Sequence, residues 1–219
     1  MKSYFGYVLF AEHLADIAGA TIERYFRGDI RAEYKNSPSP IVTIADKEVE
    51  EKLREEIEFE DSESGIIGEE FGERKSKNGY TWVIDPIDGT IAFSCGKPVF
   101  ASLIALMKDD VPLIGIIDQP ITKERWVGVL GNTSTLNDEP IKSSTLTDLS
   151  KAKLSTTAPG MFSDPVSAAF FRELQERVHI TSFGGDAYQY GLCASGHIDI
   201  VVEKGLNLYD WAALVPVLK

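Results

Sequence analysis

Apolar residues recur at helical spacing in two segments near the start of the chain. One segment covers residues 14–26, and the other covers residues 46–60. Prolines within residues 36–40 indicate a loop between them. Thr43, with Asp46 three positions later, predicts a helix N-cap and a weak form of the capping box. The pattern therefore predicts that two amphipathic helices open the chain.

The pattern then changes to short apolar runs bounded by Gly, Pro and Asp, which are typical of strands. These predicted strands cover residues 65–68, 80–84, 99–107, 111–118 and 124–130. From about Thr147 strands and helices alternate, with strands at 151–157, 179–183 and 197–203 and helices at 165–177, at 187–194 and from Asp210 onward. We expect an α/β layered sandwich that forms one compact unit. Residues 1–146 would supply the first helices and an antiparallel sheet, and residues 147–219 an α/β part.

Composition and charge exclude several classes of partner. The chain has 219 residues, 43% of them hydrophobic, and its 34 acidic against 22 basic residues give a formal net charge of -12. Nucleic acid and anionic membrane surfaces require a basic face, so neither is expected as a partner. No apolar run approaches the roughly 20 residues of a membrane span, and the first residues lack a signal-peptide cleavage site. We expect a cytoplasmic protein in which Cys95 and Cys193 are free thiols.

The hexapeptide DPIDGT, residues 85–90, follows the apolar run 80–84 and is the strongest chemical signal. Its two carboxylates lie three residues apart at the expected end of a strand, where Pro86 would turn the chain. Gly89 would let the backbone approach a ligand, and free amides after it could bind an anion. A DxxDG pattern also occurs in calcium loops and in ordinary Asp-Gly turns. An EF-hand fits poorly, because the further ligand series is missing.

Further carboxylates lie elsewhere in the chain. The segment GIIGEEFG places Glu69 and Glu70 in a loop after a short strand, and Asp210 stands where a helix is expected to begin. Alone, Asp210 would be interpreted as an N-cap. Carboxylates about 4 Å apart repel by roughly 4 kcal/mol per pair at an effective dielectric near 20, so such a cluster requires cations or raised pKa values. Hard oxygen ligands beside a phosphate select Mg²⁺.

These segments together resemble the inositol monophosphatase superfamily of Mg²⁺-dependent phosphatases. The matching stretches are PIVTIADKEVE, GIIGEEFG, WVIDPIDGTIAF with the following CGKP, and EKGLNLYDWAAL, in the family's order and spacing. The resemblance runs along nearly the whole chain. It implies the αβαβα sugar-phosphatase-like fold, a homodimer, two or three Mg²⁺ ions and a small phosphorylated metabolite as substrate.

The resemblance also implies roles for particular residues. Metal would be bound by the side chains of Glu70, Asp85, Asp88 and Asp210 and by the carbonyl of Ile87. Thr90 and Asp46 would orient a nucleophilic water, with Glu70 as a further catalytic carboxylate. The reaction would be direct in-line attack on a phosphate monoester without a phosphoenzyme, and amides near Gly89 and Thr90 would hold the phosphate. As alternatives, Thr90 could be a helix N-cap and Asp46 a favourable charge in a first helical turn.

The segment SFGGDAYQYGLCASGHIDIVVEKGL resembles the histidinol-phosphatase branch of the superfamily, and so does GIIDQPITKERWVG. In that branch Asp186 would offer a carboxylate to an amine of the substrate, and Glu203 would face the part of the substrate that carries no phosphate. The alternative for Asp186 is an N-cap after a Gly-Gly turn. The sequence thus predicts a histidinol-phosphatase of histidine biosynthesis, with an inositol-1-phosphatase or another small-monoester phosphatase as the alternative.

The sequence departs from the family pattern at two places. Leu208 stands where a proline is expected before the aromatic residue of the last motif, and the chain stops at VPVLK while family members continue. We therefore expect a version of the fold shortened at its C-terminus. A further alternative is an inactive relative that only binds an anionic metabolite or a partner protein.

Overall fold

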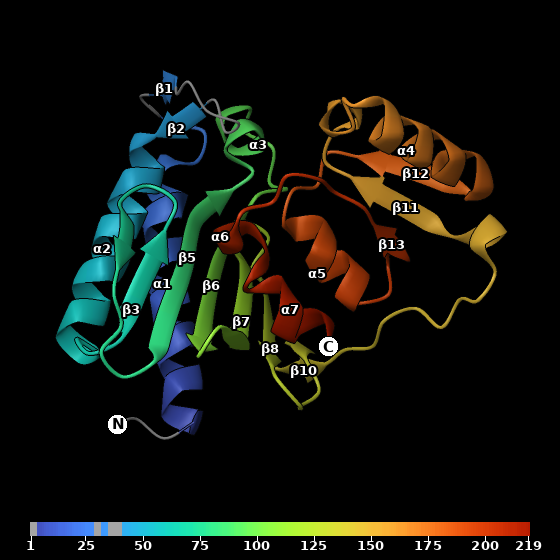
Figure 1. Cartoon of the computed structure of the whole chain (residues 1–219). Coiled ribbons are helices and arrows are strands. Elements are labelled where there is room, and N and C mark those ends of the chain that lie inside the picture. The colour runs from blue at the N-terminus through green and yellow to red at the C-terminus, as the bar shows by residue number, and fades with distance from the viewer. Residues whose placement is uncertain (1–3, 29–31, 35–40) are drawn as a thin grey trace.

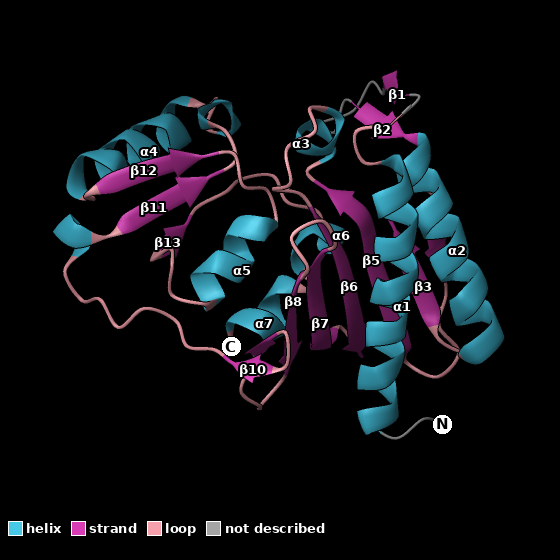
Figure 2. Ribbon diagram, turned by 180° about the vertical axis from the view of Figure 1, so that it is seen from behind, coloured by secondary structure: helices cyan, strands magenta, loops and turns pink. Residues whose placement is uncertain are grey.

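Two long helices open the chain and cover one face of a large sheet. The computed structural model describes residues 4–28, 32–34 and 41–219, and the predicted loop at 36–40 lies outside them. α1 (Tyr4–Tyr25) and α2 (Ile44–Glu60) pack against each other. In Figure 2 both stand in front of the sheet. The buried residues of each helix recur at the predicted three- and four-residue spacing, so the two amphipathic helices are confirmed.

The sheet has eight strands in the order β10-β9-β8-β7-β6-β5-β3-β4. β3 and β5 are parallel, and the other neighbouring pairs are antiparallel. The strands are β3 (Gly65–Gly68), β4 (Gly72–Arg74), β5 (Tyr80–Asp88), β6 (Ala101–Lys108), β7 (Val111–Gln119), β8 (Glu124–Val129), β9 (Thr135–Leu136) and β10 (Glu139–Pro140). β1 (Ala32–Tyr34) and β2 (Ile41–Thr43) form a separate antiparallel pair.

Both faces of the central strands are buried. Trp82 and Ile84 of β5 enter the core under α1 and α2, whereas Val83 enters a second core on the opposite face. This alternation follows from the two-residue period of a strand. Burying a large apolar side chain stabilises a fold by about 1.5–3 kcal/mol, so covering both faces of the sheet stabilises the strand that carries the aspartates.

Three further layers complete the fold (Figure 1). A parallel sheet in the order β12-β11-β13 contains β11 (Lys153–Thr156), β12 (Ile180–Phe183) and β13 (Ile200–Val201). Its outer face packs against α4 (Pro165–Arg177). Between the two sheets lie α5 (Tyr188–Ala194), α6 (Leu208–Trp211) and α7 (Leu214–Leu218), while α3 (Thr90–Ser94) follows β5. Two 3₁₀ turns cover Leu149–Lys151 and Pro159–Met161. The predicted layered α/β fold is confirmed.

A pair of glycines lets α7 lie directly on the large sheet. Gly115 of β7 and Gly128 of β8 are opposite each other in the register. A Cβ on Gly115 would lie 2.0 Å from the carbonyl oxygen of Ala213, and a Cβ on Gly128 would lie 2.3 Å from the backbone of Pro216. The missing side chains therefore form a notch for the helix backbone. α6 (Leu208–Trp211) directly precedes α7 in the chain and contacts it.

Several predicted boundaries differ from the structure. β5 does not end before Pro86 but continues to Asp88, with a register shift against β6 between Asp85 and Asp88. A β-bulge therefore replaces the expected turn. The predicted strand 197–203 is reduced to the two residues of β13. Cys95 and Cys193 are free thiols, as expected. None of the helices in the described part of the chain is long and apolar enough to cross a membrane.

Candidate active site

The site is built around the end of β5, where the bulge turns neighbouring carboxylates toward one place. Asp85 is buried, and its Oδ1 accepts a hydrogen bond of 3.1 Å from the amide of Ile87. The oxygen atoms of Asp85, Asp88 and Asp210 can all lie within 4.8 Å of one another. Residues more than 120 positions apart in the sequence thus meet at one point, as the family resemblance implied.

Asp210 comes from α6, which begins two residues earlier than predicted. Asn207 is the N-cap, and its amide donates a 2.5 Å hydrogen bond to Oδ2 of Asp210 in a capping box. The interpretation of Asp210 as the N-cap is therefore wrong, because Asp210 is the third helical residue. The single predicted helix is also divided into α6 and α7. The capping bond orients the Asp210 carboxylate from a rigid turn.

The carboxylates of this cluster are difficult to ionise together. Burial raises the pKa of Asp85 well above its ordinary value, and the charges of Glu69 and Asp88 raise it further. Burial followed by the charges of Asp186 and Asp210 does the same to the pKa of Asp88. Burial also raises the pKa of Asp210. Three oxygen donors held together at this cost fit a hard divalent cation, which would remove the repulsion.

Glu69 and Glu70 lie differently with respect to the cluster. Glu69 lines the same pocket as the three aspartates, and its charge acts on Asp85. Glu70 is not among the residues lining that pocket, and its charge acts on Asp46 instead. The role implied for Glu70 stays a prediction. Glu69 is a second candidate for the metal-binding role that the resemblance implied for Glu70.

Glu50, which sequence reasoning missed, anchors the loop that carries both glutamates. This residue of α2 is fully buried, and its carboxylate accepts hydrogen bonds from the amides of Glu70 (2.7 Å) and Phe71 (3.0 Å). Arg54 donates to the same carboxylate at 2.7 Å. A Cβ on Gly68 would lie 2.2 Å from Oε1 of Glu50, so a glycine is required there. No sequence signal distinguishes Glu50 from the other charges of its helix.

Thr90 and Asp46 meet, as the resemblance implied. Oγ1 of Thr90 lies 3.3 Å from Oδ1 of Asp46 and 3.0 Å from the carbonyl oxygen of Ile87. The other oxygen of Asp46 accepts hydrogen bonds from the amide (2.8 Å) and hydroxyl (2.6 Å) of Thr43 in a complete capping box. Burial raises the pKa of Asp46 to about 6, against the effect of the bonds from Thr43. The N-cap of α3 is Gly89, so the N-cap alternative for Thr90 is wrong.

Asp186 closes over Gly89 from the other side of the pocket. Gly89 has φ +93°, and a Cβ on it would lie 2.8 Å from Cβ of Asp186. Ala187 is the N-cap of α5 and the helix has no side-chain cap, so the N-cap alternative for Asp186 is wrong. Burial, followed by the charge of Glu203, raises the pKa of Asp186 to about 6. The amide of Ala187 donates a 2.6 Å hydrogen bond to Asp88, which joins this loop to the cluster.

One pocket of about 590 Å³ connects these groups. Most of the predicted site residues line it: Asp85, Ile87, Asp88, Gly89, Thr90, Asp186, Glu203 and Asp210. Asp46 is buried behind Thr90. Lys204 is the only basic residue among those that line the pocket, and its ammonium group pairs with Asp164. The pocket is therefore strongly acidic.

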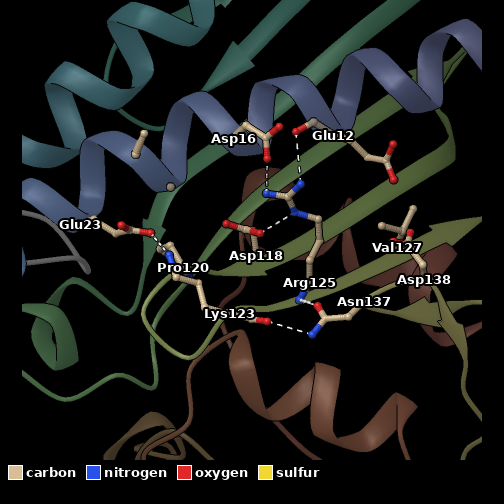
Figure 3. A pocket seen from close by; sticks show the side chains of 12 residues that line it. Glu12, Asp16, Glu23, Asp118, Pro120, Lys123, Arg125, Val127, Asn137 and Asp138 are labelled. Atoms are coloured by element: carbon tan, nitrogen blue, oxygen red, sulfur yellow. Dashed lines mark hydrogen bonds and ion pairs between the residues drawn. The ribbon is translucent and has the colours of Figure 1, made fainter.

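A second pocket, of about 630 Å³, lies between α1 and strands β7 and β8 (Figure 3). Arg125 occupies its centre and binds Asp118 at 2.6 Å and Asp16 at 2.8 Å. Lys123 pairs with Glu23 at one end. None of the predicted site residues lines this pocket, and both of its basic groups are already paired. We therefore place the chemistry in the first pocket.

The layered sandwich carries, at the end of a central strand, an acidic cluster that could hold a metal ion. Residues 7–219 match the model of the inositol monophosphatase family. The chain belongs to that family, a family of phosphatases. This confirms the predicted family and enzyme class.

Individual relatives agree with this assignment. The chain is 45% identical over 208 residues to the bifunctional phosphatase IMPL2 of Arabidopsis thaliana, covering 94% of this chain but 60% of that protein. It is 34% identical over 213 residues to the histidinol-phosphatase of Mycobacterium tuberculosis, covering 94% and 82% respectively. The solved structure of an inositol monophosphatase from Zymomonas mobilis has a TM-score of 0.88 and 41% identity, over 99% of this chain and 83% of that one.

Proposed function

We propose that this protein is a Mg²⁺-dependent histidinol-phosphatase, which converts L-histidinol phosphate and water into L-histidinol and phosphate. The observation that carries the proposal is the pair Asp186 and Glu203, which lie in the pocket in addition to the aspartate cluster. Two carboxylates beside a phosphate site suit a substrate with a cationic amine. The similarity to a histidinol-phosphatase supports the same substrate.

Asp85, Asp88 and Asp210 would hold the metal, together with the carbonyl of Ile87 and the carboxylate of either Glu69 or Glu70. All of these are hard oxygen donors, the kind that Mg²⁺ prefers. Bound Mg²⁺, proposed as two or three ions, lowers the pKa of water and neutralises charge on the phosphate and the leaving oxygen. Amides near Gly89 and Thr90 would bind the phosphate in this proposal.

Thr90 and Asp46 would orient the water that attacks phosphorus. The hydroxyl of Thr90 donates its hydrogen toward Asp46 or Ile87, which leaves its lone pairs free to accept a hydrogen from water. Asp46, held by Thr43, could then take up a proton that passes through Thr90. No side-chain nucleophile is required, in agreement with direct attack.

The substrate assignment can be tested by comparing kcat/KM for L-histidinol phosphate and inositol 1-phosphate, in the parent protein and in Asp186→Asn. We expect a preference for histidinol phosphate that this variant reduces by about tenfold, the effect of losing one charged contact. Glu124→Gln, a charge change at a residue bonded to Tyr188 and absent from the pocket lining, is the control. An equal loss on both substrates would contradict a specificity role for Asp186.

An inositol-1-phosphatase is the second candidate. Carboxylates can also accept hydrogen bonds from the hydroxyl groups of a neutral polyol, and the chain is 41% identical to an inositol monophosphatase of solved structure. A higher kcat/KM for inositol 1-phosphate would favour this candidate. Binding of Mg²⁺ and phosphate without turnover of either ester would instead favour the inactive relative.

The division at residues 146 and 147, a homodimer, a cytoplasmic location and a role in histidine biosynthesis belong to the same proposal. Their support is the sequence pattern and the family resemblance. Light scattering of the purified protein would test the dimer.

A further inference from the structure

Three hydrogen-bond donors converge on the carboxylate of Glu203. Its Oε1 accepts from the amide of Thr157 at 3.1 Å and from Nε2 of Gln189 at 2.8 Å. Its Oε2 accepts from the hydroxyl of Tyr190 at 3.0 Å. The donors come from the loop after β11 and from α5, while Glu203 follows β13. The carboxylate is therefore fixed from two sides in the wall of the pocket.

No positive charge neutralises Glu203 in the described part of the chain. The adjacent Lys204 turns away to pair with Asp164 at the start of α4. The donors to Glu203 are an amide, a side-chain amide and a phenol, all of them neutral. The carboxylate is thus held in one orientation by neutral donors alone.

Gln189 connects Glu203 to the loop that carries Asp186. The same Nε2 that donates to Glu203 also lies 3.3 Å from Oγ1 of Thr157, and Oγ1 accepts a 3.1 Å bond from the amide of Asp186. Because a carboxylate only accepts hydrogen bonds, Glu203 fixes the amide orientation of Gln189. One side chain therefore sets the positions of both carboxylates at this end of the pocket.

This arrangement leaves a defect in the core. Gln189 is 1% exposed, and its Oε1 has no hydrogen-bond partner among the described residues. A buried acceptor without a partner costs about 1–3 kcal/mol, and native proteins contain few of them. The amide nitrogen of the side chain donates to Glu203 and Thr157, while its carbonyl oxygen stays unpaired.

We propose that Gln189 and Tyr190 are positioning residues, which fix Glu203 against the cationic part of the substrate and so set specificity. Neither residue lines the pocket, so both act through Glu203. This inference rests on the proposed function and extends it. In this proposal the amine of the substrate is recognised by Glu203 together with the buried residues Gln189 and Tyr190 that hold it.

The test compares Tyr190→Phe and Gln189→Met with Tyr188→Phe in the full chain. Tyr188 is the matched control, because it lies on the same helix and donates its hydroxyl to Glu124 at 2.6 Å. KM and kcat are measured for L-histidinol phosphate and for glycerol 2-phosphate, which has no cation. Thermal unfolding is followed in parallel.

We expect Tyr190→Phe and Gln189→Met to raise KM for histidinol phosphate about tenfold, as for the loss of a bond to a charged group. kcat and the KM for glycerol 2-phosphate should stay within about twofold of the parent, because the metal site is intact. Gln189→Met should unfold close to the temperature of the parent, because the loss of the bonds to Glu203 and Thr157 is offset by the removal of an unpaired buried acceptor. When either change is added to Glu203→Gln, KM for histidinol phosphate should not rise further.

Three outcomes would overturn the inference. Tyr190→Phe could leave KM unchanged, it could impair both substrates equally, or Gln189→Met could lose stability and activity together, as a purely structural residue would. If the parent prefers histidinol phosphate and both variants keep that preference, this inference is contradicted but the proposed function is not. A parent without that preference contradicts the proposed function, and the inference with it.

Discussion

Replacing Asp88 by Asn should make the metal-free protein more stable, although it removes a residue of the site. Oxygens of Asp85, Asp88 and Asp210 lie within 4.8 Å of one another. Two charges at that distance repel by about 3.5 kcal/mol at an effective dielectric near 20, so ionised Asp88 faces about 7 kcal/mol from two neighbours. Asn keeps the acceptor for the amide of Ala187. The substitution therefore removes repulsion at little structural cost.

Protonation limits the gain and gives it a pH dependence. Protonating a carboxyl of ordinary pKa costs about 4 kcal/mol at pH 7 and about 1.5 kcal/mol at pH 5. Because about 4 kcal/mol is less than about 7 kcal/mol, the cost of protonation is the upper limit of what Asp88→Asn can recover at pH 7. The folded pKa of Asp88 is raised. The contribution of Asp88 to the stability of the metal-free protein is therefore fully present below the pKa of the unfolded state. It is lost as the pH rises through the raised pKa of the folded state.

The assay is thermal unfolding in a chelator and in excess Mg²⁺, near pH 5 and near pH 7. Without metal, Asp88→Asn should raise Tm by roughly 8–16 °C near pH 7 and by less than half of that near pH 5. Mg²⁺ at about 100 times its Kd should stabilise the parent by about 2.7 kcal/mol, and the variant far less. Asp110→Asn, at an exposed turn outside the pocket, is the control. A metal-free variant no more stable than the parent near pH 7 would refute the reasoning.

Two further substitutions test the geometry around the cluster. Glu69→Gln should weaken Mg²⁺ binding, measured by calorimetry, by more than about tenfold, because Glu69 lines the pocket. Glu70→Gln should have a smaller effect. If Glu70→Gln weakens binding more than Glu69→Gln, Glu70 is the residue that binds the metal. Gly128→Ala should lower the free energy of unfolding in urea by about 1–3 kcal/mol and also lower kcat, because its Cβ would push α7, and with it α6, off the sheet. Gly160→Ala, whose Cβ would meet open space, is the control for stability, and a Gly128→Ala protein as stable as this control would disprove the notch.

Local patterns predicted the features of the fold that depend on neighbouring residues. Helical spacing located α1 and α2, and short apolar runs located the central strands. The DPIDGT motif pointed to the end of β5 as the candidate site, because Asp85 and Asp88 of the aspartate cluster lie within six adjacent residues. Thr43 and Asp46 predicted their capping box for the same reason.

The remaining features depend on contacts between distant segments. The bulge that carries β5 past Pro86 requires β6, and the notch formed by Gly115 and Gly128 is visible only when both strands are paired. Glu50 is buried only because the loop that contains Glu70 folds over it. In the sequence alone it cannot be told apart from an exposed charged residue of a helix. The choice between Glu69 and Glu70 depends on the direction in which that loop turns. No local pattern contains this information.

The most direct test of the central claim is the release of phosphate from L-histidinol phosphate with and without Mg²⁺, by the parent and by Asp88→Asn side by side. We predict Mg²⁺-dependent release by the parent, little or none by the variant, and slower release from inositol 1-phosphate. Release that is independent of Mg²⁺, or equal in the two proteins, would contradict the metal site. A parent inert toward both esters would contradict the proposed function.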